Sequence, residues 1–370
     1  KSCIKKLLST FKPILSLLPM QFKIRKSLII YLLITILYFQ NNLYSNSSME
    51  NIDDFGIISL MYHRFEENKY PSTNIKINNF KKQLEIIENS GIEFVNPKNF
   101  EISLKENKKK RKILLTIDDA FLSFYENAWP ILKEKKIPFI LFVSTREVGS
   151  FNYMNWEQIK NISNEDFVEI GNHSHTHEYL IDKNNETIKN DITTSINIFK
   201  KKLGRNSEFF SYPFGEYSLN FKNIIKSLGF KYAFGQHSGV IDETKNFYEL
   251  PRFPINEKYG ELKRFSSLTE TLPFKYKDIT PAEKYLLNEN NPPEVKIEFV
   301  ENIKNLKSLK CYSNEGGRWR QSKINFTNVN ILEISIEEKF IGERGRINCS
   351  LRDPSGFWRW LGIQFVVGEK

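Results

Sequence analysis

Residues 112–120 read Lys-Ile-Leu-Leu-Thr-Ile-Asp-Asp-Ala, an apolar run that ends on two adjacent carboxylates. A short apolar run bounded by polar residues predicts a strand that is buried on both faces. Strand-like and helix-like runs alternate around it, and a long helix pattern at 188–203 stops at Gly204, where helices often end. This alternation is typical of parallel strands covered by helices, and so predicts an α/β fold.

The number of strand–helix repeats before residue 270 is about seven, which favours a barrel over a small open sheet. The chain has 370 residues, of which 40% are hydrophobic, enough for two domains of ordinary size. The predicted strands of the first domain lie at 55–62, 112–117, 139–143, 167–170, 209–212 and 232–234.

The pattern changes after about residue 270. Pro273, Pro281 and the Asn-Asn-Pro-Pro stretch at 290–293 predict a linker over 271–293. Short alternating segments rich in β-forming residues then predict a small all-β, sandwich-like domain at 294–370. These segments lie at 295–300, 330–336, 346–351 and 362–367.

Three tryptophans and two cysteines fall in this C-terminal domain. Trp319, Trp358 and Trp360 could stack on sugar rings, or they could form the core of this small domain or pack it against the barrel, and of these we expect the core. Cys311 and Cys349 could pair in an oxidising compartment or remain two buried thiols.

Residues 1–45 hold seven basic residues and no acid, so the rest of the chain carries only +3 of the formal net charge of +10. A nearly neutral body gives no case for nucleic-acid binding by bulk electrostatics. Lys23, Arg25 and Lys26 precede an apolar run at 28–39, which is the layout of a secretory signal peptide. The alternative is an uncleaved anchor that tethers the chain to a membrane. We therefore expect a secreted, periplasmic or cell-envelope protein.

Polar side chains gather where two predicted strands end. Asp118 and Asp119 directly follow the strand at 112–117, and parallel α/β folds place active sites at the carboxyl ends of strands. Residues 171–177 read Gly-Asn-His-Ser-His-Thr-His and hold three of the five histidines. Two imidazoles and one carboxylate leave positions open for water and substrate, which is typical of a catalytic metal site. The predicted ligands are Asp119, His173 and His177.

A third segment, Phe-Ser-Tyr-Pro-Phe-Gly at 210–215, follows another predicted strand. Proline and glycine fix an unusual backbone turn there. Such a turn can aim a backbone N–H at a developing oxyanion, or it can be an ordinary structural turn.

In this order, Asp118-Asp119, the His173–His177 pair and Tyr212-Pro213-Phe214-Gly215 resemble the first three motifs of the polysaccharide deacetylases, carbohydrate esterase family 4. Leu60-Met61-Tyr62-His63 and Leu250-Pro251-Arg252 are similar to the bacterial subgroup that includes exopolysaccharide deacetylases.

The resemblance implies a distorted (β/α)7 barrel at about 53–270 that binds a divalent metal, with zinc as the first choice. It implies that Asp118 is the general base and that the metal and the Phe214 N–H stabilise the oxyanion. The implied reaction is the hydrolysis of acetyl groups from an N-acetylated polysaccharide that contains N-acetylglucosamine.

Two departures from the family pattern lie at the site. Most members carry an arginine where this chain has Ser211, and Arg252 could supply that charge near Asp118 from another loop. The usual late histidine, the general acid, is not evident. We expect His63 to take this role because it ends the first apolar strand, with His237 as the alternative.

Two other classes of function remain open. An O-acetyl-xylan esterase or a sugar deformylase would use the same fold and ligands. A non-catalytic sugar-binding protein would keep the fold without the chemistry, although the complete set of Asp118, Asp119, His173 and His177 argues against it.

Overall fold

The computed structural model describes residues 55–106, 109–300 and 303–368, which all belong to one compact unit at 53–370. The predicted signal peptide or anchor at 1–45 lies outside the described residues. Within these three described ranges, no helix combines the length and the apolar character that a membrane span requires.

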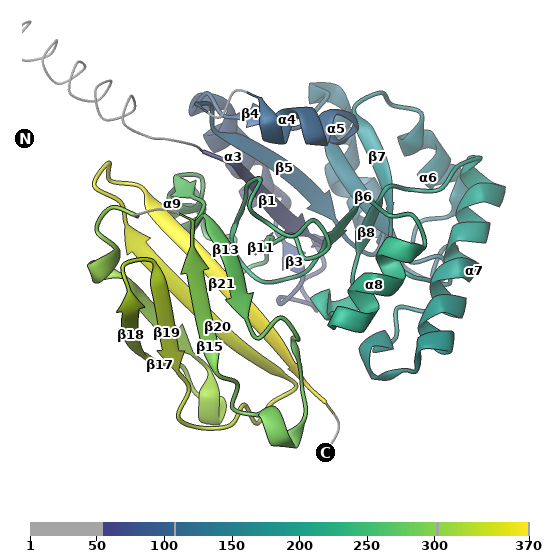
Figure 1. Ribbon diagram of the computed structural model, residues 1–370. Helices are drawn as coiled ribbons and strands as arrows, with labels where there is room; N and C mark the ends of the chain where they lie inside the picture. The colour runs from purple at the N-terminus through teal and green to yellow at the C-terminus, as the bar shows by residue number, and fades with distance from the viewer. Residues whose placement is uncertain (1–54, 107–108, 301–302, 369–370) are drawn as a thin grey trace, which may run out of the picture. The chain divides into compact units, whose positions relative to one another are not determined.

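The α/β region is built on a curled, mostly parallel sheet (Figure 1). Its strands are β1 (Ile57–Tyr62), β4 (Glu93–Phe94), β5 (Lys112–Ile117), β6 (Phe139–Val143), β7 (Val168–Asn172), β8 (Phe209–Ser211), β9 (Tyr232–Phe234), β10 (Val240–Ile241) and β11 (Phe253–Pro254). Their order is β10-β1-β5-β6-β7-β8-β9, with β4 paired to β5 and β11 paired to β1. Every residue of β1, β5 and β6 is buried, as the continuous apolar runs predict.

A short segment bridges the two ends of the curled sheet. Leu250 pairs in parallel with Phe234 of β9, and β11 pairs in parallel with β1. The segment from 250 to 254 therefore lies between the first and last parallel strands. The predicted α/β fold, a distorted barrel, is confirmed in this form.

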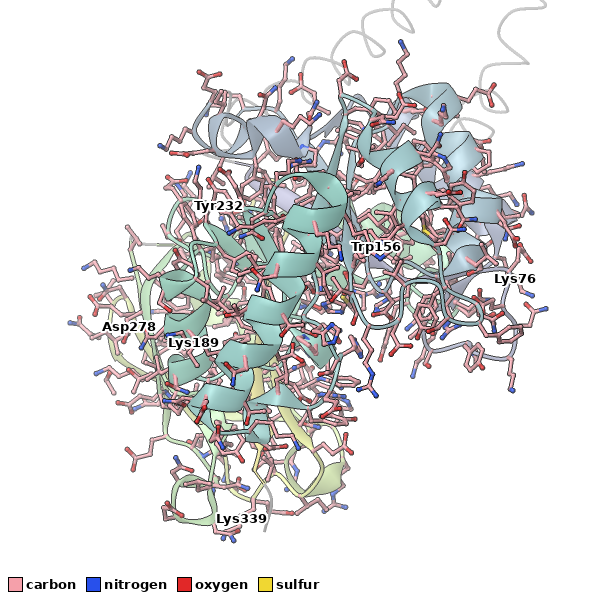
Figure 2. All side chains as sticks on the ribbon, turned by 90° about the vertical axis from the view of Figure 1, so that its right-hand side faces the viewer. Lys76, Trp156, Lys189, Tyr232, Asp278 and Lys339 are labelled. Atoms are coloured by element: carbon pink, nitrogen blue, oxygen red, sulfur yellow. A yellow bond between two sulfur atoms is a disulfide. The ribbon has the colours of Figure 1, made fainter. Side chains whose placement is uncertain are left out.

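Helices cover the outside of the sheet. They are α3 (Ile77–Asn89), α4 (Phe100–Lys105), α5 (Trp129–Lys135), α6 (Trp156–Ser163), α7 (Asn185–Leu203), α8 (Leu219–Ser227) and α9 (Leu262–Leu268). Helix α7 ends at Gly204, whose φ of 74° is the left-handed conformation that favours glycine. Helices α7 and α8 pack side by side, with exposed residues such as Lys189 on their outer face (Figure 2).

The C-terminal region is all-β and consists of two facing sheets. One has the order β12-β21-β20-β16-β17 with β14 paired to β21, and the other has the order β13-β15-β19-β18. The bounds are β12 (Thr271–Leu272), β13 (Tyr276–Thr280), β14 (Tyr285–Leu286), β15 (Val295–Phe299), β16 (Lys310–Ser313), β17 (Arg320–Gln321), β18 (Lys323–Asn328), β19 (Ile331–Ser335), β20 (Arg344–Arg352) and β21 (Trp358–Val367). Apolar side chains of both sheets form one buried cluster, as in a sandwich.

Three expectations for this region are decided by the structure. Residues 271–293 do not form a simple linker, because β12, β13 and β14 lie within this range and join both sheets. Cys311 and Cys349 form a disulfide between the neighbouring strands β16 and β20. The tryptophans do not form the core of the domain: Trp319 is 53% exposed and Trp358 is 40% exposed.

The C-terminal sheet is joined directly to the barrel. Gly239, in the loop before β10, pairs with Leu361 of β21, and the Gly362 N–H donates to the Ser238 carbonyl at 2.6 Å. A Cβ on Gly362 would lie 2.6 Å from that carbonyl oxygen, so only glycine permits the approach. Trp360 packs against the barrel core and makes an edge contact with Phe253.

Candidate active site

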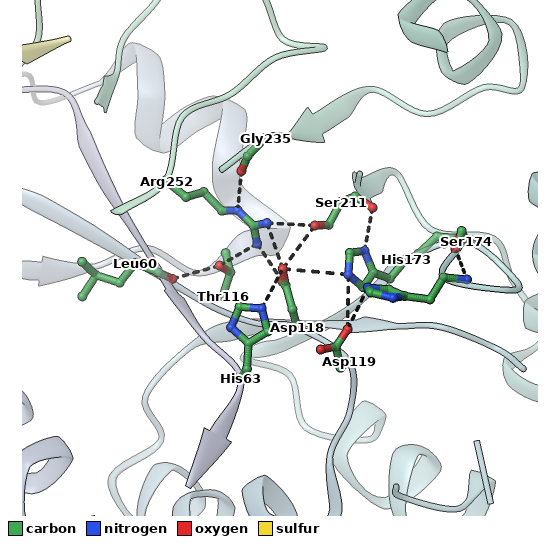
Figure 3. A network of polar contacts seen from close by, with 12 residues as sticks. Leu60, His63, Thr116, Asp118, Asp119, His173, Ser174, Ser211, Gly235 and Arg252 are labelled. Carbon is green, nitrogen blue, oxygen red and sulfur yellow. Dashed lines mark hydrogen bonds and ion pairs between the residues drawn. The ribbon is translucent and has the colours of Figure 1, made fainter. Parts of the chain in front are cut away.

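The carboxyl ends of four parallel strands bring the predicted site residues together (Figure 3). His63 follows β1, Asp118 and Asp119 follow β5, and His173 follows β7. Strand β1 pairs with β5 along its whole length, so His63 stands beside the two carboxylates. The turn at 212–215 follows β8 at the same edge of the sheet.

Asp119, His173 and His177, the predicted metal ligands, lie together, and we refer to them as the ligand triad. The Asp119 Oδ1 atom lies 3.4 Å from His173 Nε2 and 3.3 Å from His177 Nε2. One donor atom from each residue falls within 4.8 Å of the others, close enough to hold one ion. Asp119 and His177 also line an open cleft, which leaves room for water and substrate beside the donors.

Hydrogen bonds orient the two ligand histidines. His173 Nδ1 lies 2.7 Å from the Ser211 carbonyl, to which it donates, and this leaves Nε2 free to face Asp119. The backbone N–H of His177 donates to Ser174 Oγ at 3.0 Å. The middle histidine, His175, turns away and its Nδ1 contacts the Thr145 hydroxyl at 2.8 Å. This donor arrangement fits a divalent ion.

The histidine loop is held by a residue that sequence reasoning missed. Asp191 of α7 accepts hydrogen bonds from the His175 N–H at 2.8 Å and from the Thr176 N–H at 3.1 Å. It also accepts from the Thr176 hydroxyl at 2.7 Å. Asp191 lies inside a predicted helix. The sequence therefore gives no sign that its carboxylate contacts the loop that precedes this helix.

Several residues at the site adopt left-handed backbone conformations without being glycine. Asp119, Ser174, His177 and Phe214 have φ values of 74°, 71°, 54° and 59°. Such conformations cost free energy in residues with a side chain, and they concentrate where structure serves a site. The strain falls on two members of the ligand triad and on the turn beside it.

Asp118 and Arg252 form a buried ion pair next to the ligand triad. The guanidinium donates to Asp118 Oδ1 at 2.7 Å and to Oδ2 at 2.9 Å, a bidentate geometry. It also donates to the Ser211 hydroxyl at 2.9 Å. Arg252 therefore approaches Asp118 from the segment before β11. The small side chain of Ser211 leaves the space that the Arg252 guanidinium occupies.

The pKa values of both carboxylates lie below their usual range. Burial alone would raise the pKa of Asp118, but the charges of Arg252 and His173 lower it. Burial would also raise the pKa of Asp119, but the hydrogen bond from His173 and the charge of His177 lower this pKa by more. Both residues are therefore ionised at neutral pH.

The two candidate acids, His63 and His237, occupy different places. His63 Nε2 lies 3.9 Å from Asp118 Oδ2. His63 and Asp118 therefore lie on the same side of the ligand triad and not on opposite sides (Figure 3). His237 lines the cleft but contacts Tyr217 at 3.4 Å, and burial lowers its pKa to about 3. Of the two, only His63 reaches a carboxylate of the described site.

The turn at 212–215 packs against the ligand triad. The Phe214 ring lies 4.7 Å from the His177 ring and stacks on Tyr179 at 4.1 Å. Tyr212 is buried and donates its hydroxyl to the Tyr248 carbonyl at 3.0 Å. Gly215 has a φ of 70°, and a Cβ there would lie 2.3 Å from the Gln236 side chain, so the turn requires glycine.

The cleft beside the ligand triad has a volume of about 550 Å³, within the range of ligand sites. Its second wall comes from the C-terminal sheet, which sequence reasoning did not place at the site. The side chains on this wall are Trp319, Arg344, Arg346, Asn348, Trp360 and Gln364.

A model of the polysaccharide deacetylase family matches residues 105–233. That range holds the ligand triad, Asp118 and the turn at 212–215. Over these residues, the barrel is similar to the polysaccharide deacetylases.

Individual proteins are similar to it as well. Poly-beta-1,6-N-acetyl-D-glucosamine N-deacetylase of Staphylococcus aureus (strain MSSA476) is 28% identical over 207 residues, which cover 52% of this chain and 71% of the relative. The protein of the same name from Staphylococcus epidermidis (strain ATCC 35984) is 26% identical over 220 residues, with coverages of 55% and 74%.

Two solved structures agree with the fold. IcaB from Ammonifex degensii superposes with a TM-score of 0.54 at 25% identity, covering 58% of this chain and 97% of that one. The deacetylase PplD of Streptococcus pyogenes superposes with a TM-score of 0.52 at 23% identity, covering 57% and 99%.

Proposed function

We propose that this chain is a metal-dependent N-deacetylase that releases acetate from a poly-N-acetylglucosamine, with β-1,6-linked polymer as the first candidate. The observation that carries the proposal is the ligand triad, which lies beside the ionised Asp118 and opens onto a cleft through Asp119 and His177. The names of the similar staphylococcal proteins support the choice of polymer.

The ligand triad would hold the ion, and two histidines with one carboxylate suit zinc best among common metals. A divalent ion bound there supplies Lewis acidity, which allows a carboxylate as weakly basic as Asp118 to take a proton from water. Arg252 keeps Asp118 ionised and fixes its orientation through two hydrogen bonds. Arg252 is thus a positioning residue for the base.

The turn at 212–215 supports stabilisation of the oxyanion. The Phe214 N–H donates to no other group in the described part of the chain, while the next two N–H groups bond back within the turn. The left-handed conformation of Phe214 fixes the direction of this free donor. A preorganised N–H of this kind favours the charge that develops on the acetamide oxygen.

The leaving nitrogen must gain a proton when the C–N bond breaks. Attack of water forms the C–O bond, acetate leaves the amide, and the sugar keeps an amine. His63 Nε2 lies 3.9 Å from Asp118 Oδ2, which is longer than a hydrogen bond, so the pair must close in the substrate complex for His63 to pass this proton to the nitrogen. Burial lowers the pKa of His63, so the ring is neutral before the reaction begins.

The same proposal extends to location. The basic and apolar segment at 1–45 supports export or a membrane tether through 28–39, and the disulfide between Cys311 and Cys349 supports an oxidising compartment. We infer a secreted, periplasmic or envelope-associated enzyme.

A substrate panel tests the proposed function. The zinc-loaded chain is given β-1,6-linked N-acetylglucosamine oligomers, chitooligosaccharides, peptidoglycan, acetyl-xylan and an N-formylated sugar. We expect acetate and a new amine from the β-1,6-linked oligomers. Release only from acetyl-xylan, or formate as the only product, would replace the proposal with an esterase or a deformylase. Binding without any product would indicate a sugar-binding protein.

A further inference from the structure

Side chains along β20 alternate between the two faces of the C-terminal sheet. This alternation explains how the sheet forms one wall of the cleft. Ile347, Cys349 and Leu351 are buried in the core between the two sheets. The alternate side chains face the other way and meet the barrel. Three of them line the cleft: Arg344, Arg346 and Asn348.

Arg344 is neutralised on this wall. Its Nε donates to Glu216 at 2.7 Å, and Glu216 lies directly after the turn at 212–215. This ion pair joins the sheet to the barrel and leaves no net charge for a ligand.

Arg346 is not neutralised. Its Nε donates to the Gln364 amide oxygen at 3.3 Å, and no carboxylate among the described residues pairs with it. The side chain is half-buried, and burial together with the nearby charge of Arg344 lowers the pKa of Arg346, while Tyr259 and Glu216 raise it by less. The remaining guanidinium nitrogens are available to the cleft.

A second arginine of the same kind lines the cleft from the barrel. Arg264 of α9 donates to the Tyr259 carbonyl and lies over the Tyr259 ring at 5.1 Å. It too is half-buried, has a pKa lowered by burial, and pairs with no carboxylate in the described ranges.

The other charges of the cleft do not offset these two. Asp118 is already paired with Arg252, and an ion on the ligand triad would add positive charge beside Asp119. A cleft with this excess of positive charge attracts anions, and it repels cations such as a deacetylated glucosamine unit. Neutral sugar hydroxyls could be bound by amide side chains without the cost of desolvating two guanidinium groups.

We propose that Arg346 and Arg264 bind an anionic group, a carboxylate or a phosphate, that the polysaccharide carries near the acetamido sugar being deacetylated. Guanidinium groups bind both anions through paired, charge-assisted hydrogen bonds. This inference rests on the proposed deacetylation, and it makes the C-terminal sheet a determinant of substrate choice.

Three matched substrates test it with the zinc-loaded full chain: a β-1,6-linked N-acetylglucosamine pentamer, the same pentamer with one O-succinyl group, and the same pentamer with one phosphate monoester. We expect kcat/KM for at least one charged pentamer to exceed that for the neutral one by roughly 10- to 100-fold, the scale of a charge-assisted hydrogen bond. The two charged arms distinguish carboxylate from phosphate.

Variants assign the preference to the two arginines. Arg346→Gln should remove most of this preference, and Arg346→Gln with Arg264→Gln should remove the rest. Arg352→Gln, at the exposed end of the same strand, is the matched control and should keep the preference. Equal kcat/KM values for all three pentamers, or a preference that survives in the double variant, would overturn the inference.

Failure of the proposed function remains distinguishable. If no pentamer is deacetylated, the proposed activity fails, and calorimetric binding to the zinc-loaded Asp118→Asn chain then tests the arginines by themselves. Tighter binding of a charged pentamer that Arg346→Gln abolishes would support the anion site, and equal affinities would refute it.

Discussion

Arg252→Gln is the substitution for which the structure gives the clearest expected magnitude. The Arg252 side chain is fully buried and donates hydrogen bonds to Gly235, Thr116, Ser211 and both oxygens of Asp118. Gln cannot reproduce the charge, so the buried Asp118 carboxylate loses the group that keeps its pKa low.

Removing one partner of a buried ion pair costs about 3–5 kcal/mol, because the other charge stays buried without compensation. We therefore expect the free energy of unfolding to fall by about this amount in urea titrations. Deacetylation should also fall by about 10²–10⁴-fold, as for the loss of a general base, since Asp118 is then protonated or misplaced. Arg352→Gln serves as the exposed control and should change neither quantity.

A rescue variant separates this account from a general loss of packing. Ser211 already contacts Arg252 and lies 3.4 Å from Asp118 Oδ2, so an arginine at 211 can approach the same carboxylate. Combining Ser211→Arg with Arg252→Ala should restore part of the activity that Arg252→Ala loses. A stable Arg252→Gln chain with wild-type kcat would refute the reasoning, because Asp118 would then need no cationic partner.

Three further outcomes follow from the geometry. His63→Ala should slow amide hydrolysis strongly but an activated aryl acetate much less, since a phenolate leaves without a proton; equal losses in kcat/KM would reduce His63 to a structural role. Deleting the residues after 290 should give an insoluble or strongly destabilised barrel, because Trp360 and the backbone pairing at Gly239 are lost; a soluble truncated chain with an unchanged Tm would contradict this. Replacing Cys311 and Cys349 by serine should lower the free energy of unfolding by about 2–4 kcal/mol in urea titrations. Unchanged stability would show that the disulfide does not constrain the unfolded chain.

Much of the barrel could be predicted because its strands are buried on both faces. Continuous apolar runs at 112–117 and 139–143 coincide with β5 and β6 residue for residue. Parallel strands place their carboxyl ends at one edge, so polar residues after separate strands could be expected to meet. Asp118, Asp119 and His173 are of this kind.

Other parts of the site depend on tertiary contacts that leave no local pattern. The approach of Arg252 to Asp118 was suggested only by the small residue at 211. Asp191 lies within a helix pattern, and its contact with the histidine loop depends on how α7 packs.

The C-terminal region was predicted less well for a physical reason. Short strands between prolines, such as β13 before Pro281, look like a linker because each has few residues to alternate. The tryptophans were expected in the core because large aromatic side chains usually bury well. Trp319 is instead exposed at the cleft. Side chains alternate along β20, so its arginines line one wall of the cleft. The sequence pattern of one strand cannot show that the strand lies beside an active site.

Metal content measured together with acetate release tests the central claim most directly. The chain stripped by a chelator should be inactive and should recover with zinc. Asp118→Asn should keep the ion and lose about 10²–10⁴ in rate, whereas His177→Ala should lose the ion itself. Full activity in a preparation that elemental analysis finds free of metal would contradict the account, as would an Asp118→Asn chain that is empty beside a His177→Ala chain that is full.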